Sequence, residues 1–161
     1  MSVQKVREYL KQYGREGDIV EHQASTATVE EAAAAFGVSP AQIAKTLAFR
    51  GKDGHPVLIL FAGDAKADNH KFKMFFGCKA SMLKPDEVLQ YTGHPIGGVC
   101  PFALPEEQKI SVYLDISLKR FATVYPACGS SHSGIAVAPE DLFHLSPAQA
   151  WIDVGKGWKE S

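Results

Sequence analysis

The chain has little cysteine and no long apolar run. Three of its 161 residues are cysteine (Cys78, Cys100 and Cys128), and no two of them have the spacing of metal ligands. So sparse and odd a set argues against a disulfide framework and favours a reduced, cytosolic protein. No apolar run approaches the roughly 18 residues of a membrane span, and the charged N-terminus lacks the apolar core of a signal peptide. We expect a cytoplasmic protein with no membrane partner, no metal and no cofactor.

The sequence also lacks an excess of charge of either sign. It has 17 basic and 18 acidic residues, a net charge of −1 and a pI near 6.6. A protein that coats nucleic acid usually carries a strong basic excess, so we expect no DNA partner. Contact with a few phosphates at one end of an RNA is still allowed. The length and the average composition predict one domain over residues 1–161.

The hydrophobic patterns predict short helices and strands in irregular alternation. Helices are expected at 3–13, 28–37, 40–45, 68–77, 84–93 and from residue 139, and strands at 18–22, in two runs within 46–63, and at 109–115, 122–127 and 135–138. Asp53-Gly54 is a strong hairpin signal, so the sheet cannot be purely parallel. The pattern therefore predicts an α+β fold with short helices around a mixed, curved sheet.

Lys45 is the first candidate functional residue. It stands where a capped helical turn, "SPAQIAK", meets the apolar run "TLAF". A lysine at the start of a buried strand is partly removed from water and can hold a phosphate, hydroxyl or carboxylate of a ligand. The structural alternative is a surface lysine that is favoured by the C-terminal end of a helix dipole.

A second candidate is the stretch "GHPIGGVCPF" at residues 93–102. Gly97 and Gly98 permit backbone conformations closed to other residues, and Pro95 and Pro101 stiffen the ends. Consecutive N–H groups in such a loop can converge on a carbonyl oxygen or an anion. The alternative is a purely structural turn.

Two nucleophiles compete with this interpretation. Cys100 could be activated by His94, six residues earlier, although its apolar neighbours favour a small packed residue. Ser131 and His132 lie in the polar loop "CGSSHSG", but its second glycine comes one place too late for a hydrolase elbow, and adjacent side chains point apart. A polar loop that lines a pocket is the alternative.

A local basic patch is the last candidate. Lys66, His70 and Lys73 fall on one face of a helix expected around 66–76. A solvated helix face explains such a pattern, and so does a small surface that docks RNA phosphates while the overall charge stays neutral.

Several ordered motifs resemble a known family. The segments "TATVEEAAAAFGVSPAQIAKTLAF", "FAGDAKADNHKF", "GHPIGGVCPFALP", "VYLDISLKRFATVYPACGS" and "APEDL" are similar to the YbaK/EbsC family, the freestanding form of the prolyl-tRNA synthetase-associated editing domain. The resemblance runs from about residue 20 to 145. It implies a mixed, partly barrel-like sheet and hydrolysis of the ester of mischarged aminoacyl-tRNA, typically tRNA(Pro) carrying a small wrong amino acid.

The resemblance also assigns the site. Lys45 would contact the terminal adenosine or the substrate, and the backbone from Gly97 to Pro101 would hold the aminoacyl end. The catalytic residues expected are Lys45, Gly97, Gly98 and Val99, and the substrate-binding residues are His22, Thr28, Thr46, Pro101, Gly129, Ser130 and Ser131. Val20 is a further candidate for the pocket wall. The expected partners are the acceptor end of aminoacyl-tRNA and prolyl-tRNA synthetase.

The hypothesis is hydrolysis without a protein nucleophile, in which loop N–H groups polarise the ester carbonyl and Lys45 stabilises developing charge. Its rivals are a non-catalytic module that binds RNA ends and a hydrolase with Cys100 or Ser131 as nucleophile. The chain departs from relatives at Cys100, where serine is common, and at Ala136, where relatives that act on cysteinyl-tRNA(Pro) have an acidic residue. The amino acid removed is therefore open among alanine, serine, threonine, cysteine and small non-protein amino acids.

Overall fold

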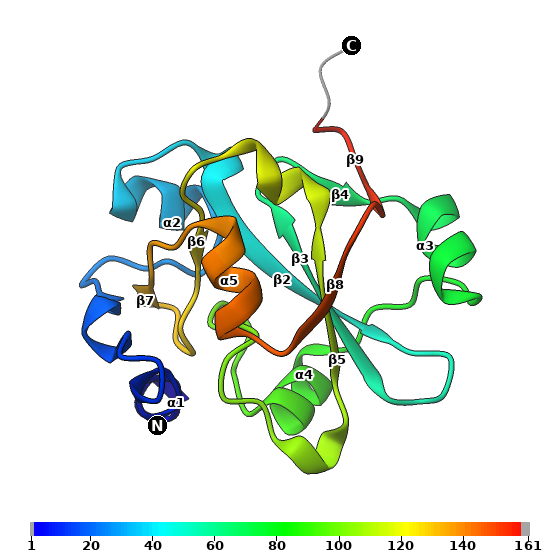
Figure 1. Ribbon diagram of the computed structural model, residues 1–161, viewed down its shortest axis with the longest axis horizontal. Helices are drawn as coiled ribbons and strands as arrows, with labels where there is room; N and C mark the ends of the chain where they lie inside the picture. The colour runs from blue at the N-terminus through cyan, green and yellow to red at the C-terminus, as the bar shows by residue number, and fades with distance from the viewer. Residues whose placement is uncertain (1, 159–161) are drawn as a thin grey trace.

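The computed structural model describes residues 2–158, which form five short α-helices around a curled five-stranded sheet (Figure 1). The helices are α1 (Ser2–Lys11), α2 (Val29–Phe36), α3 (Asn69–Phe76), α4 (Pro85–Thr92) and α5 (Pro139–Leu145). The strands are β1 (Val20–Glu21), β2 (Ile43–Arg50), β3 (Pro56–Ala62), β4 (Lys66–Ala67), β5 (Ser111–Asp115), β6 (Tyr125–Pro126), β7 (Ser133–Gly134), β8 (Ala148–Ile152) and β9 (Gly155–Lys156). Four 3-10 turns connect them, η1 (Glu16–Asp18), η2 (Pro40–Gln42), η3 (Glu106–Gln108) and η4 (Ile116–Arg120).

The main sheet has the order β6-β2-β3-β5-β8 and is mixed. The β2 and β3 strands form the antiparallel hairpin predicted from Asp53-Gly54, with Gly54 at a φ of +89°. The other pairs, β2 with β6, β3 with β5 and β5 with β8, are parallel. The sheet curls into a half-barrel, so the predicted fold class is confirmed. Within residues 2–158, no helix has the length and apolar character that a bilayer crossing requires.

The β3 strand is buried along its whole length, as its apolar run predicts. Because side chains alternate along a strand, it supplies two cores. Leu58 and Leu60 pack with α5, which lies in front of the sheet in Figure 1, and with the buried face of α1. Ile59 and Phe61 point the other way and pack with Phe72 of α3.

The helix caps fall where the sequence places them. Thr28 accepts a hydrogen bond from the Glu31 N–H at 3.1 Å, and Gly37 ends α2 with a φ of +72°. The expected helix at 40–45 is wrong in its extent, because η2 ends at Gln42. Lys45 is consequently the third residue of β2.

Several other boundaries also need correction. The expected strand at 135–138 is reduced to an isolated bridge between Val124 and Val137. The sequence interpretation missed β8 after the last helix, and it missed the ribbon of β4 and β9. Lys66 therefore belongs to β4, ahead of α3.

Candidate active site

A cavity of about 270 Å³ opens at the beginning of β2. Its walls come from the segment that leads into α2, the first half of β2, the loop after α4 and the short strand β6. These parts are remote in sequence but adjacent in the fold, since β6 pairs with the first residues of β2. Five of the predicted site residues line the cavity, namely Thr28, Lys45, Thr46, Gly97 and Val99.

Lys45 is half-buried in this wall, so the expectation of a lysine partly removed from water is confirmed. Its ammonium donates a hydrogen bond to the backbone carbonyl of Gly63 at 3.3 Å. Burial lowers the pKa of Lys45, and the negative charge of Asp64 opposes this shift. The alternative of a surface lysine at a helix terminus is wrong.

The glycine loop contributes Gly97 and Val99 to the cavity wall. Gly97 has a φ of +92° and occupies the third position of a tight turn, which the Gly98 N–H closes by donating to the Pro95 carbonyl at 2.9 Å. Within residues 2–158, the N–H groups of Gly97 and Val99 make no hydrogen bond. The expectation that Gly98 offers its N–H to a substrate is therefore wrong, because that group is used inside the turn.

Gly98 instead packs the loop against the segment after β6. A Cβ at Gly98 would lie 2.4 Å from the Ser130 nitrogen. Gly129 donates its N–H to the Gly98 carbonyl at 2.9 Å and is itself buried against Ser2. Gly98, Gly129 and Ser130 thus support the cavity without lining it, and Pro101 is buried outside its wall.

The expected substrate-binding side chains divide into three cases. Thr28 lines the cavity, but its hydroxyl oxygen caps α2. Thr46 lines it with a buried hydroxyl that has no hydrogen-bond partner in residues 2–158. His22 stands behind the wall with its ring 4.6 Å from that of Phe36, and Val20 lies outside the lining, 41% exposed. A buried hydroxyl without a partner is costly, so the role expected of Thr46 in substrate binding stays a prediction that this geometry favours.

The polar loop at 128–134 does not contain a serine–histidine pair. His132 places its Nδ1 3.1 Å from the Ala24 carbonyl oxygen, and its backbone N–H donates to the Ser130 hydroxyl at 3.2 Å. Ser131 lies outside the cavity lining but packs against Gly97, since a Cβ at Gly97 would lie 3.4 Å from that of Ser131. The geometry of this loop therefore gives no support to Ser131 as a nucleophile.

Cys100 is a buried residue of the glycine loop. Its side chain is fully buried and its sulfur lies 3.6 Å from the Nε2 atom of His94. Burial raises the pKa of the Cys100 thiol to about 12 and lowers the pKa of the His94 imidazole. A nucleophilic cysteine needs the opposite shift, so the proximity to His94 does not activate the thiol.

Comparison with known proteins identifies the family of the chain that forms this cavity. Residues 23–145 match the aminoacyl-tRNA editing domain. The chain belongs to this family. The editing domain resembles YwhH of Bacillus subtilis (strain 168), described as uncharacterized, with 53% identity over 99% of this chain and 100% of that protein. The YbaK-like family predicted from the sequence motifs is thereby confirmed.

Two further comparisons place the editing domain among proteins linked to proline tRNA. A segment covering 57% of the chain is 37% identical to 16% of the proline–tRNA ligase of Geobacter sp. (strain M21). A crystal structure whose description proposes a trans-editing enzyme for prolyl tRNA synthetase has a TM-score of 0.85 and 33% identity, over 97% of this chain and 98% of that one. The match to the ligase is confined to a small part of that protein.

The predicted basic patch has a different geometry from the one expected. His70 and Lys73 lie exposed on α3, but Lys66 lies on β4. Lys66 is close enough for its charge to lower the pKa of Lys45, and it stands directly opposite Lys156 of β9. The patch thus begins beside the cavity and includes a lysine that the sequence interpretation did not single out.

The aromatic wall of the cavity was also missed. Phe36 and Tyr125 line it with ring centroids 4.9 Å apart, and Ile96 forms the rim with 56% of its surface exposed. Tyr125 reaches the site because it is in register with Ile43 of β2. A parallel pairing over such a sequence separation leaves no local signal, so only the position of Ile96, beside Gly97, could have been inferred.

Proposed function

We propose that this editing domain is a trans-editing hydrolase that deacylates mischarged aminoacyl-tRNA, with tRNA(Pro) carrying a small non-cognate amino acid as its substrate. The observation that carries the proposal is that Lys45, Gly97 and Val99 line the same cavity, and that the N–H groups of Gly97 and Val99 have no hydrogen-bond partner in residues 2–158. A cation and preorganised N–H donors are the groups that stabilise the oxyanion formed when an ester is attacked.

The reaction needs no protein nucleophile. Water adds to the ester carbonyl carbon, the N–H groups of Gly97 and Val99 hold the developing oxyanion, and Lys45 neutralises part of its charge. The carbon–oxygen bond to the terminal ribose then breaks, and the amino acid leaves as a carboxylate. Of the two protons of the added water, one goes to the departing ribose oxygen and the other to solvent. One preorganised donor of this kind is worth about 3 kcal/mol of transition-state stabilisation.

The size of the cavity favours a small aminoacyl group. Its volume of about 270 Å³ lies just below the range of about 300–1,000 Å³ that is typical of sites for whole small molecules. Apolar walls at Phe36, Ile43 and Leu47 suit a small side chain, while Thr46 adds one buried hydroxyl. We propose that the aminoacyl group enters and that the rest of the tRNA stays outside.

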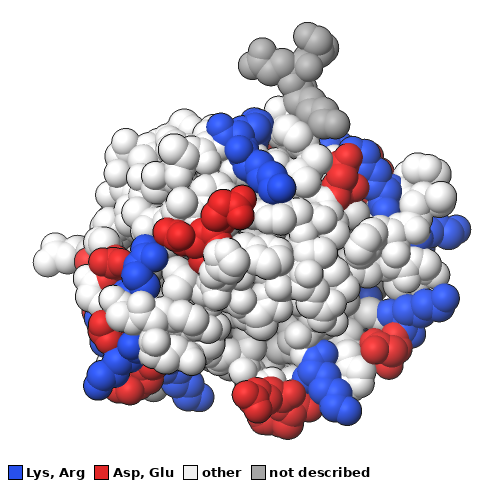
Figure 2. Space-filling view, in the orientation of Figure 1, with Lys and Arg blue, Asp and Glu red and all other residues white. Residues whose placement is uncertain are grey.

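The adjoining basic residues would hold the RNA. Lys66 and Lys156 face each other across an antiparallel ribbon, where like charges repel. A phosphate between them would relieve this repulsion, and His70 and Lys73 would extend the path along α3. Figure 2 shows basic and acidic side chains interspersed on the face it draws, with no broad field of one sign. Phosphate binding would then be local and dependent on salt.

The relatives suggest the partner and the setting. The proline–tRNA ligases contain a segment similar to this chain, so a separate editing domain would act on tRNA that prolyl-tRNA synthetase has mischarged and released. We propose that residues 1–161 act as one domain in the cytoplasm, with the synthetase as a partner.

A deacylation panel tests the function. The protein is mixed with tRNA(Pro), and with other tRNAs, charged with alanine, cysteine, serine, threonine or proline, and loss of the ester is followed over time. We expect hydrolysis of at least one small non-cognate ester on tRNA(Pro), loss of that activity in Lys45→Ala, and full activity in Lys11→Ala, which changes an exposed lysine of α1.

Two outcomes would contradict the proposal. Binding of charged tRNA without hydrolysis of any ester would identify a non-catalytic module for RNA ends. A covalent adduct between the protein and an activated ester would instead identify a nucleophile, and its position by mass spectrometry would show whether Cys100 or Ser131 carries it.

A further inference from the structure

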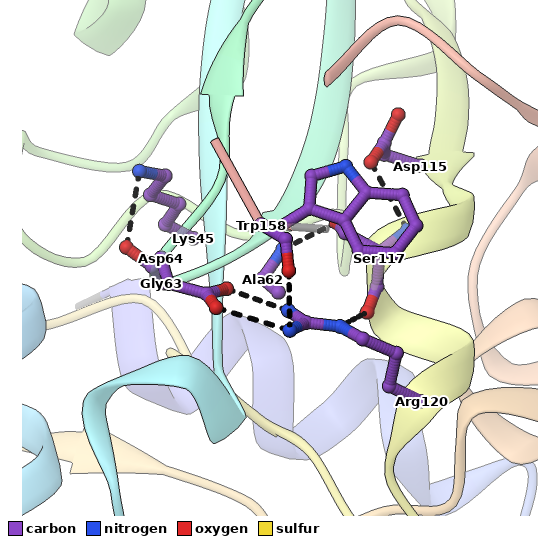
Figure 3. A network of polar contacts seen from close by, with 8 residues as sticks. All are labelled: Lys45, Ala62, Gly63, Asp64, Asp115, Ser117, Arg120 and Trp158. Carbon is purple, nitrogen blue, oxygen red and sulfur yellow. Dashed lines mark hydrogen bonds and ion pairs between the residues drawn. The ribbon is translucent and has the colours of Figure 1, made fainter. Parts of the chain in front are cut away.

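An ion pair lies next to the backbone carbonyl that Lys45 contacts. Arg120, the last residue of η4, binds both carboxylate oxygens of Asp64, at 2.6 Å and 3.0 Å (Figure 3). Bidentate pairs of this kind fix the geometry of both side chains. Asp64 follows Gly63, whose carbonyl accepts the hydrogen bond from Lys45. In Figure 3 the Asp64 carboxylate points toward Arg120, whereas the Lys45 ammonium lies on the side of the Gly63 carbonyl.

Arg120 is itself held from three sides. Its Nε donates to the Ser117 carbonyl at 2.9 Å, and its Nη1 donates to the Trp158 carbonyl at 3.2 Å. The guanidinium also stacks over the rings of Phe121 and Trp158, at 4.7 Å and 4.9 Å from their centroids. So many contacts restrict the guanidinium to one orientation, and they hold the Asp64 carboxylate with it.

The backbone at the end of β3 is anchored at three consecutive residues. The Ala62 N–H donates to the buried Ser117 hydroxyl at 3.1 Å. Gly63 packs so tightly that a Cβ there would lie 2.0 Å from the Pro40 carbonyl oxygen. Asp64 is then bound by Arg120. Since η4 supplies both Ser117 and Arg120, it fixes the carbonyl that orients the Lys45 ammonium.

Three charged side chains act on Lys45, and one of them is Asp64, which Arg120 holds in place. Asp64 and Glu30 act on Lys45 as negative charges, and Lys66 acts as a positive one. Within residues 2–158, the ion pair of Asp64 is with Arg120, and none joins Asp64 to Lys45. A carboxylate released from Arg120 would be next to a partly desolvated ammonium, where ion pairing is stronger than in water.

We propose that Arg120 is a positioning residue of the editing site, which holds Asp64 away from Lys45 so that the lysine ammonium stays available to the substrate. The proposal rests on the proposed function, because Lys45 is the group it serves. Without Arg120, Asp64 pairs with Lys45, competes with the ester and adenosine for the ammonium, and draws it out of the cavity.

The first test measures Lys45 without any tRNA. The pKa of Lys45 is followed by NMR of the lysine Cε groups, with the Lys45 signal identified by its loss in Lys45→Arg. We compare the wild type with Arg120→Gln, Asp64→Asn and the double variant. The pKa should rise in Arg120→Gln, where Asp64 acts unopposed, and fall in Asp64→Asn, where the cation of Arg120 remains. The double variant should return close to the wild type, because the charges removed cancel.

The second test is a rescue of activity. Deacylation by Arg120→Gln should fall by about tenfold in kcat/KM, which corresponds to about 1.4 kcal/mol. Adding Asp64→Asn should restore most of this loss, because the competing carboxylate is gone while the arginine is still missing. A purely structural role for Arg120 predicts the reverse, since the second substitution would remove another anchor. Thermal unfolding of all the variants checks that the proteins compared are folded.

The outcomes separate this inference from the proposed function. An unchanged Lys45 pKa in folded Arg120→Gln, or a double variant no more active than Arg120→Gln, would overturn the positioning role. If the wild type hydrolyses no ester, the proposed function fails, and the NMR titration still decides whether Arg120 keeps Asp64 from Lys45. If Arg120→Gln does not fold, Arg120→Lys replaces it, because lysine keeps the positive charge but not the bidentate contact with Asp64. The Lys45 pKa must still rise in that variant, and an unchanged pKa would overturn the positioning role.

Discussion

Gly129 donates its backbone N–H to the carbonyl oxygen of Gly98 at 2.9 Å, and this bond joins two loops that are about thirty residues apart in the chain. Gly98 lies between Gly97 and Val99, which both line the cavity. The two backbones approach so closely that Gly98 has no room for a side chain. The positions of Gly97 and Val99 in the cavity wall therefore depend on Gly98, which does not itself line the cavity.

Gly98→Ala should consequently reduce both stability and activity. Its Cβ would lie 2.4 Å from the Ser130 nitrogen and 2.6 Å from the Gly129 carbonyl carbon, so the loops must separate. Overpacking of this kind costs about 1–3 kcal/mol in the free energy of unfolding. Urea denaturation measures the loss, and deacylation kinetics should show a lower kcat from the displaced Gly97 and Val99.

Gly17→Ala is the control for that substitution. A Cβ at Gly17 would meet open space, and the residue does not have a positive φ, so alanine should be tolerated there without loss of activity. Equal effects of the two substitutions would show that the Gly98 contact has no special role.

Thr46→Val should separate ligand contact from stability. The Thr46 hydroxyl is buried without a partner in residues 2–158, so its removal should leave the free energy of unfolding within about 0.5 kcal/mol or raise it. The same variant should change the relative rates for alanyl, seryl and threonyl esters if the hydroxyl contacts the aminoacyl group. Denaturation and the deacylation panel, applied to one protein preparation, measure both effects.

Thr92→Val provides the matched control for Thr46. The Thr92 hydroxyl donates to the Val88 carbonyl at 2.6 Å and accepts from the His94 N–H at 3.0 Å. Its loss leaves a buried donor unpaired, which costs about 1–3 kcal/mol. A Thr46 variant that destabilises as much as the Thr92 variant would show that the Thr46 hydroxyl has a structural partner.

The sequence predicted that Lys45 is partly buried, but it did not predict which residues surround it. The apolar run after it and the helix cap before it placed the lysine at a boundary, and the structure confirms partial burial. Its contact with Gly63 comes from the β2–β3 pairing, in which Lys45 lies opposite Phe61. The register of a hairpin can be counted from its turn, whereas the pairing of β6 with β2 joins segments far apart in the chain and cannot be predicted in this way. The sequence therefore did not reveal that Tyr125 and Phe36 line the cavity.

The hydrogen bonds of the glycine loop could not be predicted from the sequence either. Glycine and proline content predicted a shaped backbone, and the turn at Gly97 confirms it. Which N–H is left unbonded depends on a single hydrogen bond, from Gly98 to Pro95. Composition sets the conformations that a loop can adopt, but it does not specify which of the N–H groups is bonded inside the turn.

Lys45→Met should stabilise the protein while abolishing its activity. Because burial lowers the Lys45 pKa, the charged lysine is less favourable in the folded state than in the unfolded chain. This destabilisation is complete below the folded pKa and disappears as the pH rises through it toward the unfolded value of 10.5. The gain in the free energy of unfolding of Lys45→Met should therefore be present at pH 7 and shrink at alkaline pH, as denaturation at several pH values would show.

Cys100, the candidate nucleophile of the sequence, should resist alkylation in the folded protein. Cys100 and Cys128 are both fully buried, and burial raises both thiol pKa values, that of Cys100 to about 12, so neither forms appreciable thiolate near neutral pH. Iodoacetamide at pH 8 should modify the half-buried Cys78 first in the folded protein, and all three cysteines only after denaturation, as read by mass spectrometry. Cys100→Ser should keep kcat/KM within about threefold, a change of under about 1 kcal/mol. Rapid alkylation of Cys100 with parallel loss of deacylation would restore the thiol as the attacking group, and the water mechanism would then have to be abandoned.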